Sequence, residues 1–255
     1  MQATYKQTAI KAAKEAGKIL MKYYGKGIKG RVKFEDSLVS KVDLEAEKKI
    51  ISIIKSKYPG HAILSEECGS KKGNSYKWLI DPLDGTHNYL YGIPLFGTSI
   101  ALEYNGEVIL GVIYLPYYNQ LYVAEKGKGA FLNGKRIRVS KTNKLKKAMI
   151  IYDGGLQRSK KSKLKALDKL IDAVFRIRIL GAACVNLISV AKGGADIYLE
   201  HSTNPWDVAA GLLIVEESGG KVTTLDGKKH DLSEKGFVAS NGKLHKDIIR
   251  LTKKF

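Results

Sequence analysis

Between residues 94 and 138 the chain consists of short strand patterns, and helical patterns lie on both sides of this block. Apolar and polar residues alternate there with a period of two, which is typical of half-buried strands. Asn-Gly and Lys-Gly pairs separate the strands, as in tight hairpin turns. We expect strands at 97–103, 108–114, 121–125 and 130–132. The block therefore predicts an antiparallel sheet that packs against helices.

Helical spacing appears before the strand block and returns after it. Residues 5–23 place apolar side chains three and four apart, and a second such pattern runs from 44 to 58 and closes at Pro59-Gly60. Later helices are expected at 160–173, 182–192 and 206–218 and at the C-terminus, with strands at 62–65, 77–80, 148–152, 175–179 and 195–199. Helices before, between and after two strand systems predict a layered α/β sandwich. We place an N-terminal half at 1–140 and a C-terminal half at 141–255.

Several classes of protein are excluded by composition. With 44% hydrophobic and 27% charged residues the chain is globular in type. Its longest apolar runs, such as 209–215, are far shorter than the roughly 18 residues that span a bilayer. Lysines interrupt the N-terminal apolar pattern, which does not suit a signal peptide. Two cysteines cannot build a disulfide framework or a four-thiolate zinc site. We expect no membrane partner and a cytoplasmic location.

The chain is strongly basic, with 44 Lys and Arg against 25 Asp and Glu and a net charge of +19. Lys supplies 37 of these cations and is scattered, whereas nucleic-acid readers concentrate Arg and aromatic residues in one stripe. A solvated Lys-rich surface, as in thermophiles, is one interpretation. A positive field that attracts anionic substrates is another, and both can hold. We expect no specific nucleic-acid partner.

Residues 80–88, Ile-Asp-Pro-Leu-Asp-Gly-Thr-His-Asn, are the most informative segment for chemistry. Asp81 and Asp84 lie where a strand is expected to end, and they could point at one spot beside the carbonyl of Leu83. Such an oxygen-only set suits Mg²⁺. The two amides after Asp84 would form an anion cradle at a helix start. An Asx-turn with a helix cap explains the same pattern, so this segment alone leaves both interpretations open.

Three further segments that contain acidic residues favour the catalytic interpretation. Glu66 and Glu67 follow an expected strand, and Asp43 lies at the start of the second helix, where it could simply complement the helix dipole. Asp207 follows Trp206 at the first turn of an apolar helix. Acids buried at such a place are normally paired or metal-bound.

Taken together, these motifs resemble the inositol monophosphatase family of lithium-sensitive, Mg²⁺-dependent sugar phosphatases. The resemblance covers essentially the whole chain, and its most specific part is the pair Asp-Pro-x-Asp-Gly-Thr and Trp-Asp-x-Ala-x-Gly. The matching segments are Ser37-Leu38-Val39-Ser40 with Asp43, Glu66-Glu67, Asp81 to Asn88, Gly181-Ala182-Ala183 with Asn186, and Trp206 to Gly211. The resemblance implies an alternating α-β-α-β-α sandwich, usually dimeric, of an archaeal type.

The resemblance also implies roles for individual residues. Glu66, Asp81 and the Leu83 carbonyl match the ligands of a first Mg²⁺. Asp81, Asp84 and Asp207 match those of a second, and Glu67 lies near a third, which gives two or three Mg²⁺ per subunit. Asp43 and Thr86, with Glu66, match the residues that orient and deprotonate the attacking water. The implied substrate contacts are Asp84, Gly85, Thr86, Arg178, Gly181, Ala183, Glu200 and Asp207.

The function that follows is hydrolysis of inositol 1-phosphate and fructose 1,6-bisphosphate by in-line attack of a metal-activated water. Arg176 and Arg178 could hold the second phosphate of a bisphosphate, although Arg178 also matches a position near the subunit interface of a homodimer. Two alternatives stay open. One is a related phosphatase of 3′-phosphoadenosine 5′-phosphate, and the other is a basic nucleic-acid-binding protein.

Overall fold

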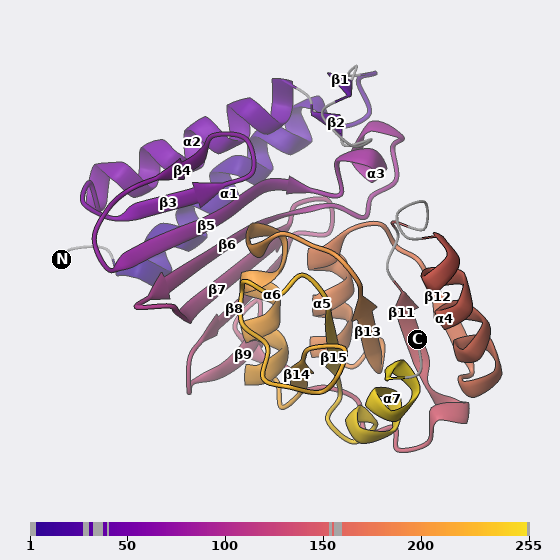
Figure 1. The fold of residues 1–255 in the computed structure, drawn as a ribbon. Helices are drawn as coiled ribbons and strands as arrows, with labels where there is room; N and C mark the ends of the chain where they lie inside the picture. Colours follow the sequence, from indigo (N-terminus) through magenta and orange to yellow (C-terminus); the bar gives the residue numbers. More distant parts are fainter. Residues whose placement is uncertain are drawn as a thin grey trace.

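The computed structural model describes residues 4–27, 31–32, 38–39, 41–152, 155 and 160–253 (Figure 1). Ser37 and Ser40 of the matching segments lie outside these residues. The helices are α1 (Tyr5–Tyr23), α2 (Lys41–Lys57), α3 (Thr86–Leu90), α4 (Lys160–Ala173), α5 (Ala183–Ala191), α6 (Pro205–Glu217) and α7 (His245–Thr252), with a 3-10 turn at Leu145–Lys147.

Most strands form two mixed sheets, and β1 (Arg31–Val32) pairs separately with β2 (Leu38–Val39). The larger sheet has the order β10-β9-β8-β7-β6-β5-β3-β4 and the smaller one β12-β11-β13-β15-β14. The larger sheet contains β3 (Ala62–Ser65), β4 (Gly69–Lys71), β5 (Tyr76–Asp84), β6 (Gly97–Tyr104), β7 (Glu107–Leu115), β8 (Gln120–Glu125), β9 (Gly129–Leu132) and β10 (Lys135–Arg136). The smaller one contains β11 (Met149–Tyr152), β12 (Arg176–Arg178), β13 (Ile197–Glu200), β14 (Lys221–Thr223) and β15 (Phe237–Ser240).

The elements stack in five layers, which confirms the expected α-β-α-β-α sandwich. Helices α1 and α2 cover one face of the larger sheet, and α5 and α6 pack between the two sheets. Helices α4 and α7 cover the outer face of the smaller sheet, toward the lower right in Figure 1. Three clusters of buried apolar side chains fill the spaces between these layers, and the one around α5 and α6 contains residues from both sheets. Burial of this apolar surface is the main stabilising contribution to the fold.

Helix α6 occupies the centre of this stack and has no solvent face between Val208 and Val215, all of which are buried. Glycines allow its close packing. A Cβ added at Gly111 on β7 would lie 2.6 Å from the carbonyl oxygen of Ala210, and one added at Gly211 would overlap the side chain of Leu187 on α5. The helix therefore contacts a sheet on one side and a helix on the other at backbone distance.

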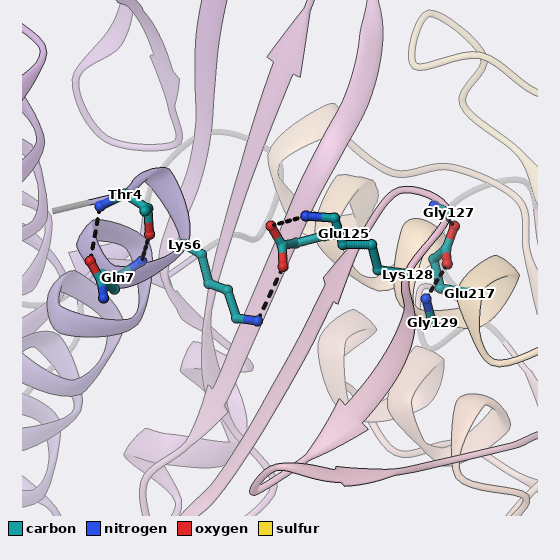
Figure 2. A network of polar contacts seen from close by, with 8 residues as sticks. All are labelled: Thr4, Lys6, Gln7, Glu125, Gly127, Lys128, Gly129 and Glu217. Carbon is teal, nitrogen blue, oxygen red and sulfur yellow. Dashed lines mark hydrogen bonds and ion pairs between the residues drawn. The ribbon is translucent and has the colours of Figure 1, made fainter.

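Polar contacts join α1 and α6 to the β8–β9 hairpin (Figure 2). The Glu217 carboxylate, at the end of α6, accepts hydrogen bonds from the amides of Gly127 and Gly129 at 2.7 and 2.6 Å. Glu125 lies at the same hairpin and pairs with Lys6 of α1 at 3.1 Å and with Lys128 at 3.2 Å. The hairpin is thus anchored by Lys6 of the N-terminal helix and by Glu217 of the central helix α6.

Two local differences from expectation have clear causes. The strand expected at 77–80 continues as β5 to Asp84, because a bulge accommodates Pro82 instead of ending the strand. Strand β4 was not expected, since its residues are all exposed and carry no alternating pattern. Among the described residues, no helix combines the length and apolar character needed to cross a membrane.

Candidate active site

The bulge in β5 decides how its two aspartates point. Asp81 lies opposite Ser99 on β6, whereas Asp84 lies opposite Gly97, so three steps on β5 match two steps on β6. In a regular strand, residues three apart face opposite sides of the sheet, and the extra residue brings Asp81 and Asp84 to the same side. Pro82 has no amide to donate to the ladder, and its carbonyl instead accepts a hydrogen bond from the Thr98 hydroxyl at 2.9 Å.

Gly85 makes the tight turn from β5 into α3. Its φ is +85°, in the left-handed region, and a Cβ there would lie 2.8 Å from the carbonyl of Leu95 and 2.9 Å from Cβ of Ala182. Glycine is required both for the backbone conformation and for this close approach. The turn places Thr86 at the start of α3, where its hydroxyl lies 3.0 Å from the Leu83 carbonyl and 3.2 Å from Oδ1 of Asp43.

Asp84 joins β5 to the start of α5 in the middle layer. Its Oδ1 accepts a hydrogen bond from the amide of Ala183 at 3.2 Å, and its Oδ2 accepts one from the amide of Cys184. Burial raises the pKa of Asp84, while the hydrogen bonds from these amides act in the opposite direction. The carboxylate therefore brings two segments about one hundred residues apart into contact.

Asp207 lies in the first turn of α6 and closes a capping box. Its Oδ2 accepts hydrogen bonds from the amide of Asn204 and the hydroxyl of Thr203, both at 3.0 Å. Burial, followed by the charge of Asp84, raises the pKa of Asp207 to about 7. The influence of Asp84 shows that the start of α6 and the end of β5 share one electrostatic environment.

Asp81 lies at the electrostatic centre of this cluster. Burial raises its pKa well above the ordinary value, and the next largest contributions come from Glu66, Asp84, Asp207 and Asp43. As the side chains are oriented, no three His, Cys, Asp or Glu residues of the described ranges converge on one point as metal ligands. Asp84 and Asp207 are turned toward neighbouring amides instead. Buried carboxylates that repel one another nevertheless fit a hard cation such as Mg²⁺, which would neutralise them.

The expected substrate contacts from the C-terminal half are less uniform. Gly181 has φ +74° and lies beside Asn88, whose side-chain amide donates to the carbonyls of Leu180 and Leu95 at 2.7 and 2.9 Å. Asn88 thus ties the turn before α5 to the loop after α3. The amide of Ala183 donates to Asp84, as described above.

Glu200 and Arg178 lie on the smaller sheet. Glu200 is buried at the end of β13, where its Oε1 accepts hydrogen bonds from the amides of His201 and Ser202 at 3.0 and 3.1 Å and its Oε2 accepts one from the Tyr198 hydroxyl. Arg178 lies on the edge strand β12 and is exposed, and its guanidinium donates to the carbonyl of Ile177 at 2.9 Å. The structure therefore holds Glu200 firmly and leaves Arg178 at the surface.

Comparison with known proteins decides the family. Residues 1–254 match the model of the inositol monophosphatase family. The chain belongs to this family.

Relatives and solved structures agree with that membership. The fructose-1,6-bisphosphatase/inositol-1-monophosphatase of Thermotoga maritima is 37% identical over 95% of this chain and 93% of its own length. The protein of the same name from Aquifex aeolicus is 39% identical over 98% and 96%. A solved inositol monophosphatase of Thermotoga maritima superposes with a TM-score of 0.90 at 36% identity, covering 96% of this chain and 95% of that one. This member of the inositol monophosphatase family is an enzyme of the phosphoric-monoester-hydrolase class.

One buried acid of this family member was missed by sequence analysis. Glu47 of α2 accepts hydrogen bonds from the amides of Glu67 and Cys68, in the turn that carries Glu66. A signal was available, because Glu47 follows Asp43 by four residues and shares its helix face with apolar Val42, Ala46 and Ile50. The partners of Glu47 were not visible in the sequence, since they lie on another element.

Proposed function

We propose that this protein hydrolyses phosphate monoesters of polyols and sugars with Mg²⁺, inositol 1-phosphate and fructose 1,6-bisphosphate in particular. The observation that carries the proposal is the β5 bulge, which puts Asp81 and Asp84 on one face, with Asp84 directly at the start of α5. The two bisphosphatase/monophosphatase relatives support the same substrates. An oxygen-rich buried cluster beside a helix start suits a cation and a phosphate together.

We propose that Glu66, Asp81 and the Leu83 carbonyl would hold one Mg²⁺, and that Asp81, Asp84 and Asp207 would hold a second. Glu67 lies near a looser third position. The mutual repulsion of these acids at Asp81 supports the assignment. Bound there, Mg²⁺ would offset the repulsion, acidify the attacking water and stabilise the departing alkoxide. Reorientation of Asp84 and Asp207 away from their amide donors would accompany binding.

The proton of the attacking water is assigned to Thr86 and Asp43. The Thr86 hydroxyl can donate to Oδ1 of Asp43, 3.2 Å away, and its own oxygen can then accept from a water. As the water oxygen bonds to phosphorus, its proton moves to Thr86 Oγ1 and the Thr86 proton moves to Asp43. The bond from phosphorus to the ester oxygen breaks in line, and that oxygen leaves with the electron pair and is protonated from solvent. Glu66 would assist in orienting this water.

The substrate lies, in this proposal, between the two halves of the chain. The amides of Gly85 and Thr86 hold the phosphate, flanked by Asp84 and Asp207, and Gly181 and Ala183 border the alcohol. Glu200 accepts hydrogen bonds from polyol hydroxyls, and its two backbone donors support this role because they fix the carboxylate at the end of β13.

We also propose a homodimer located in the cytoplasm. Phe175 and Ile179 are 56% and 46% exposed at the ends of the edge strand β12, next to Arg176 and Arg178. Exposed apolar side chains along an unpaired strand edge favour association. Arg176 and Arg178 would then either brace the partner or hold the second phosphate of a bisphosphate.

A panel of phosphate esters with phosphate release as the readout tests the proposal. We expect Mg²⁺-dependent hydrolysis of inositol 1-phosphate and fructose 1,6-bisphosphate, and loss of turnover in excess EDTA. Preference for 3′-phosphoadenosine 5′-phosphate would favour the nucleotide-side alternative. Turnover that is unaffected by EDTA would reject the metal assignment.

Two variants separate the substrate roles within the same panel. Glu200→Ala should impair inositol 1-phosphate by roughly 10- to 100-fold and p-nitrophenyl phosphate little, because the aryl ester has no hydroxyls to bind. Neutralising Arg176 and Arg178 should impair fructose 1,6-bisphosphate most. Equal losses on all substrates with an intact dimer would contradict this division.

A further inference from the structure

Helix α2 presents two buried carboxylates, one turn apart, on the face that is turned into the fold. Asp43 and Glu47 are 0% and 1% exposed. Asp43 faces the Thr86 hydroxyl, whereas Glu47 faces the turn that follows β3. A single rigid helix therefore contacts two parts of the candidate site that are distant in sequence.

The turn that carries Glu66 is held from two sides. The amide of Glu66 donates a hydrogen bond to the carbonyl of Ile80 at 3.3 Å, and Ile80 directly precedes Asp81. The next two amides, of Glu67 and Cys68, both donate to Oε1 of Glu47, at 3.0 and 3.1 Å. Three successive amides are thus fixed, and with them the backbone from which the Glu66 carboxylate projects.

A carboxylate is an expensive acceptor for this purpose. Burying a carboxylate costs more than burying a neutral acceptor, and Glu47 is 1% exposed. A carboxylate gives stronger hydrogen bonds to backbone amides than a neutral acceptor does. The stronger hold is useful where a ligand must keep its direction to within a fraction of an ångström.

We propose that Glu47 is a positioning residue for the metal site. It fixes the Glu66–Glu67 turn, and because Glu47 and Asp43 lie on the same helix, it also fixes the position of that turn relative to Asp43. This inference rests on the proposed role of Glu66 as a metal ligand. Glu47 itself touches neither metal nor substrate.

The test is a titration of metal-free, full-length protein with Mn²⁺. Electron paramagnetic resonance measures the concentration of free Mn²⁺ at each step, which gives the dissociation constant. Glu47→Met removes the acceptor at similar length, and Glu47→Gln keeps an oxygen that can accept both amides. We expect the dissociation constant for Mn²⁺ to rise by about 10- to 100-fold in Glu47→Met, as for other outer partners of metal ligands, and by no more than about threefold in Glu47→Gln. The Mg²⁺ concentration for half-maximal activity should rise in parallel, with kcat at saturating Mg²⁺ nearly retained.

Glu103→Met is the matched control. Glu103 is a buried carboxylate on β6 that pairs with Lys77 at 2.8 Å, so its loss tests removal of a buried acid outside the site. Its Mn²⁺ affinity should equal that of the parent protein. Equal weakening in Glu103→Met and Glu47→Met would overturn the positioning role, because the effect would then be one of general stability.

Glu66→Gln distinguishes this inference from the proposed function. If Glu66→Gln leaves Mn²⁺ binding unchanged, the proposed metal site is rejected, and the role of Glu47 with it. If Glu66→Gln weakens binding and Glu47→Met does not, only the role of Glu47 is rejected. Should Glu47→Met not fold, Glu47→Asp replaces it, since it keeps the charge but withdraws the acceptor by one methylene. An unchanged affinity in Glu47→Asp would equally overturn the inference.

Discussion

The hydroxyl of Thr86 lies within hydrogen-bonding distance of both Asp43 and the Leu83 carbonyl. Thr86→Ala removes this hydroxyl but keeps the backbone amide proposed to hold the phosphate. We expect kcat to fall by about 100-fold or more with little change in KM, as for a group that acts mainly in the transition state. Steady-state kinetics at saturating Mg²⁺ measures both constants.

Thr86→Ser supplies the control for this experiment, because serine restores the hydroxyl without the methyl group. It should recover most of kcat. A rise in KM alone for Thr86→Ala would identify Thr86 as a binding residue and reject its role in water activation.

Asp81 illustrates a conflict between stability and activity at one residue. Its Oδ1 accepts a hydrogen bond from the Leu83 amide at 3.0 Å, and an asparagine oxygen can do the same. Asp81→Asn would remove the negative charge of Asp81, which the carboxylates of Glu66 and Asp84 repel. In EDTA we expect the free energy of unfolding to rise by about 1 kcal/mol or more, while activity with Mg²⁺ falls by at least about 100-fold. Urea unfolding and phosphate release test the two halves of this prediction, and a destabilised variant would contradict the first.

Among the elements, the β8–β9 hairpin depends on one carboxylate at the end of α6 (Figure 2). Glu217→Ala leaves the amides of Gly127 and Gly129 without this acceptor. We expect a loss of about 1–3 kcal/mol in unfolding free energy and faster hydrogen exchange at these two amides. Lys128→Ala is the comparison, because its ion pair with Glu125 is solvent-exposed and worth at most about 1 kcal/mol. Similar losses in both variants would show that the hairpin is not specifically held by Glu217.

We expect the packing of α7 on the smaller sheet to depend on pH through His245. This residue is 3% exposed, and its ring nitrogens lie 2.8 Å from the hydroxyls of Thr223 on β14 and Ser240 on β15. Burial, with a smaller contribution from Lys221, lowers the pKa of His245 to about 4. The unfolded chain protonates near pH 6.5, so the stability due to neutral His245 is complete above that pH and is lost as the pH falls toward 4.

Urea unfolding at pH 7 and pH 5 checks this prediction. When the pH falls from 7 to 5, the free energy of unfolding of the parent protein should decrease by about 2 kcal/mol more than that of His245→Gln does. Equal losses would show that the histidine does not become protonated on unfolding in this range. Contributions that are common to both proteins cancel in this comparison.

At the scale of the whole molecule, the two sheets lie on either side of residue 140 but share the apolar cluster around α5 and α6. A fragment of residues 1–140 would expose Leu79, Ile113 and Tyr122, which the cluster buries. We therefore expect this fragment to lack a cooperative unfolding transition by circular dichroism. A sharp transition would show that residues 1–140 fold as an independent domain. The division at residue 140 is a prediction that this experiment tests.

How far the sequence predicts the molecule depends on the range of the interaction. Period-two and helical patterns placed most elements and the layered class correctly, because burial of one face is a local property of each segment. Helix α2 starts at Lys41, not at 44. The run of β5 through Pro82 depends on pairing with β6. Asp81, Asp84 and Asp207 can be predicted as metal ligands from the sequence because each lies in a contiguous motif, and these roles stay predictions. The hydrogen bonds that turn Asp84 toward the amides at the start of α5, and those between Glu47 and the turn after β3, arise only from tertiary contact. The bonds of Asp207 belong to a local capping box with Asn204.

The buried position of α6 has a practical consequence. Asp207 opens a helix whose next eight residues have no solvent face, so disturbing that helix disturbs the core that it fills. We therefore expect heating to unfold the start of α6 only together with the surrounding core. In a warmed preparation, the surviving rate of phosphate release would report the fraction of native molecules. Inactive but folded material would not accumulate, and an activity half-life would serve as a clock for global unfolding.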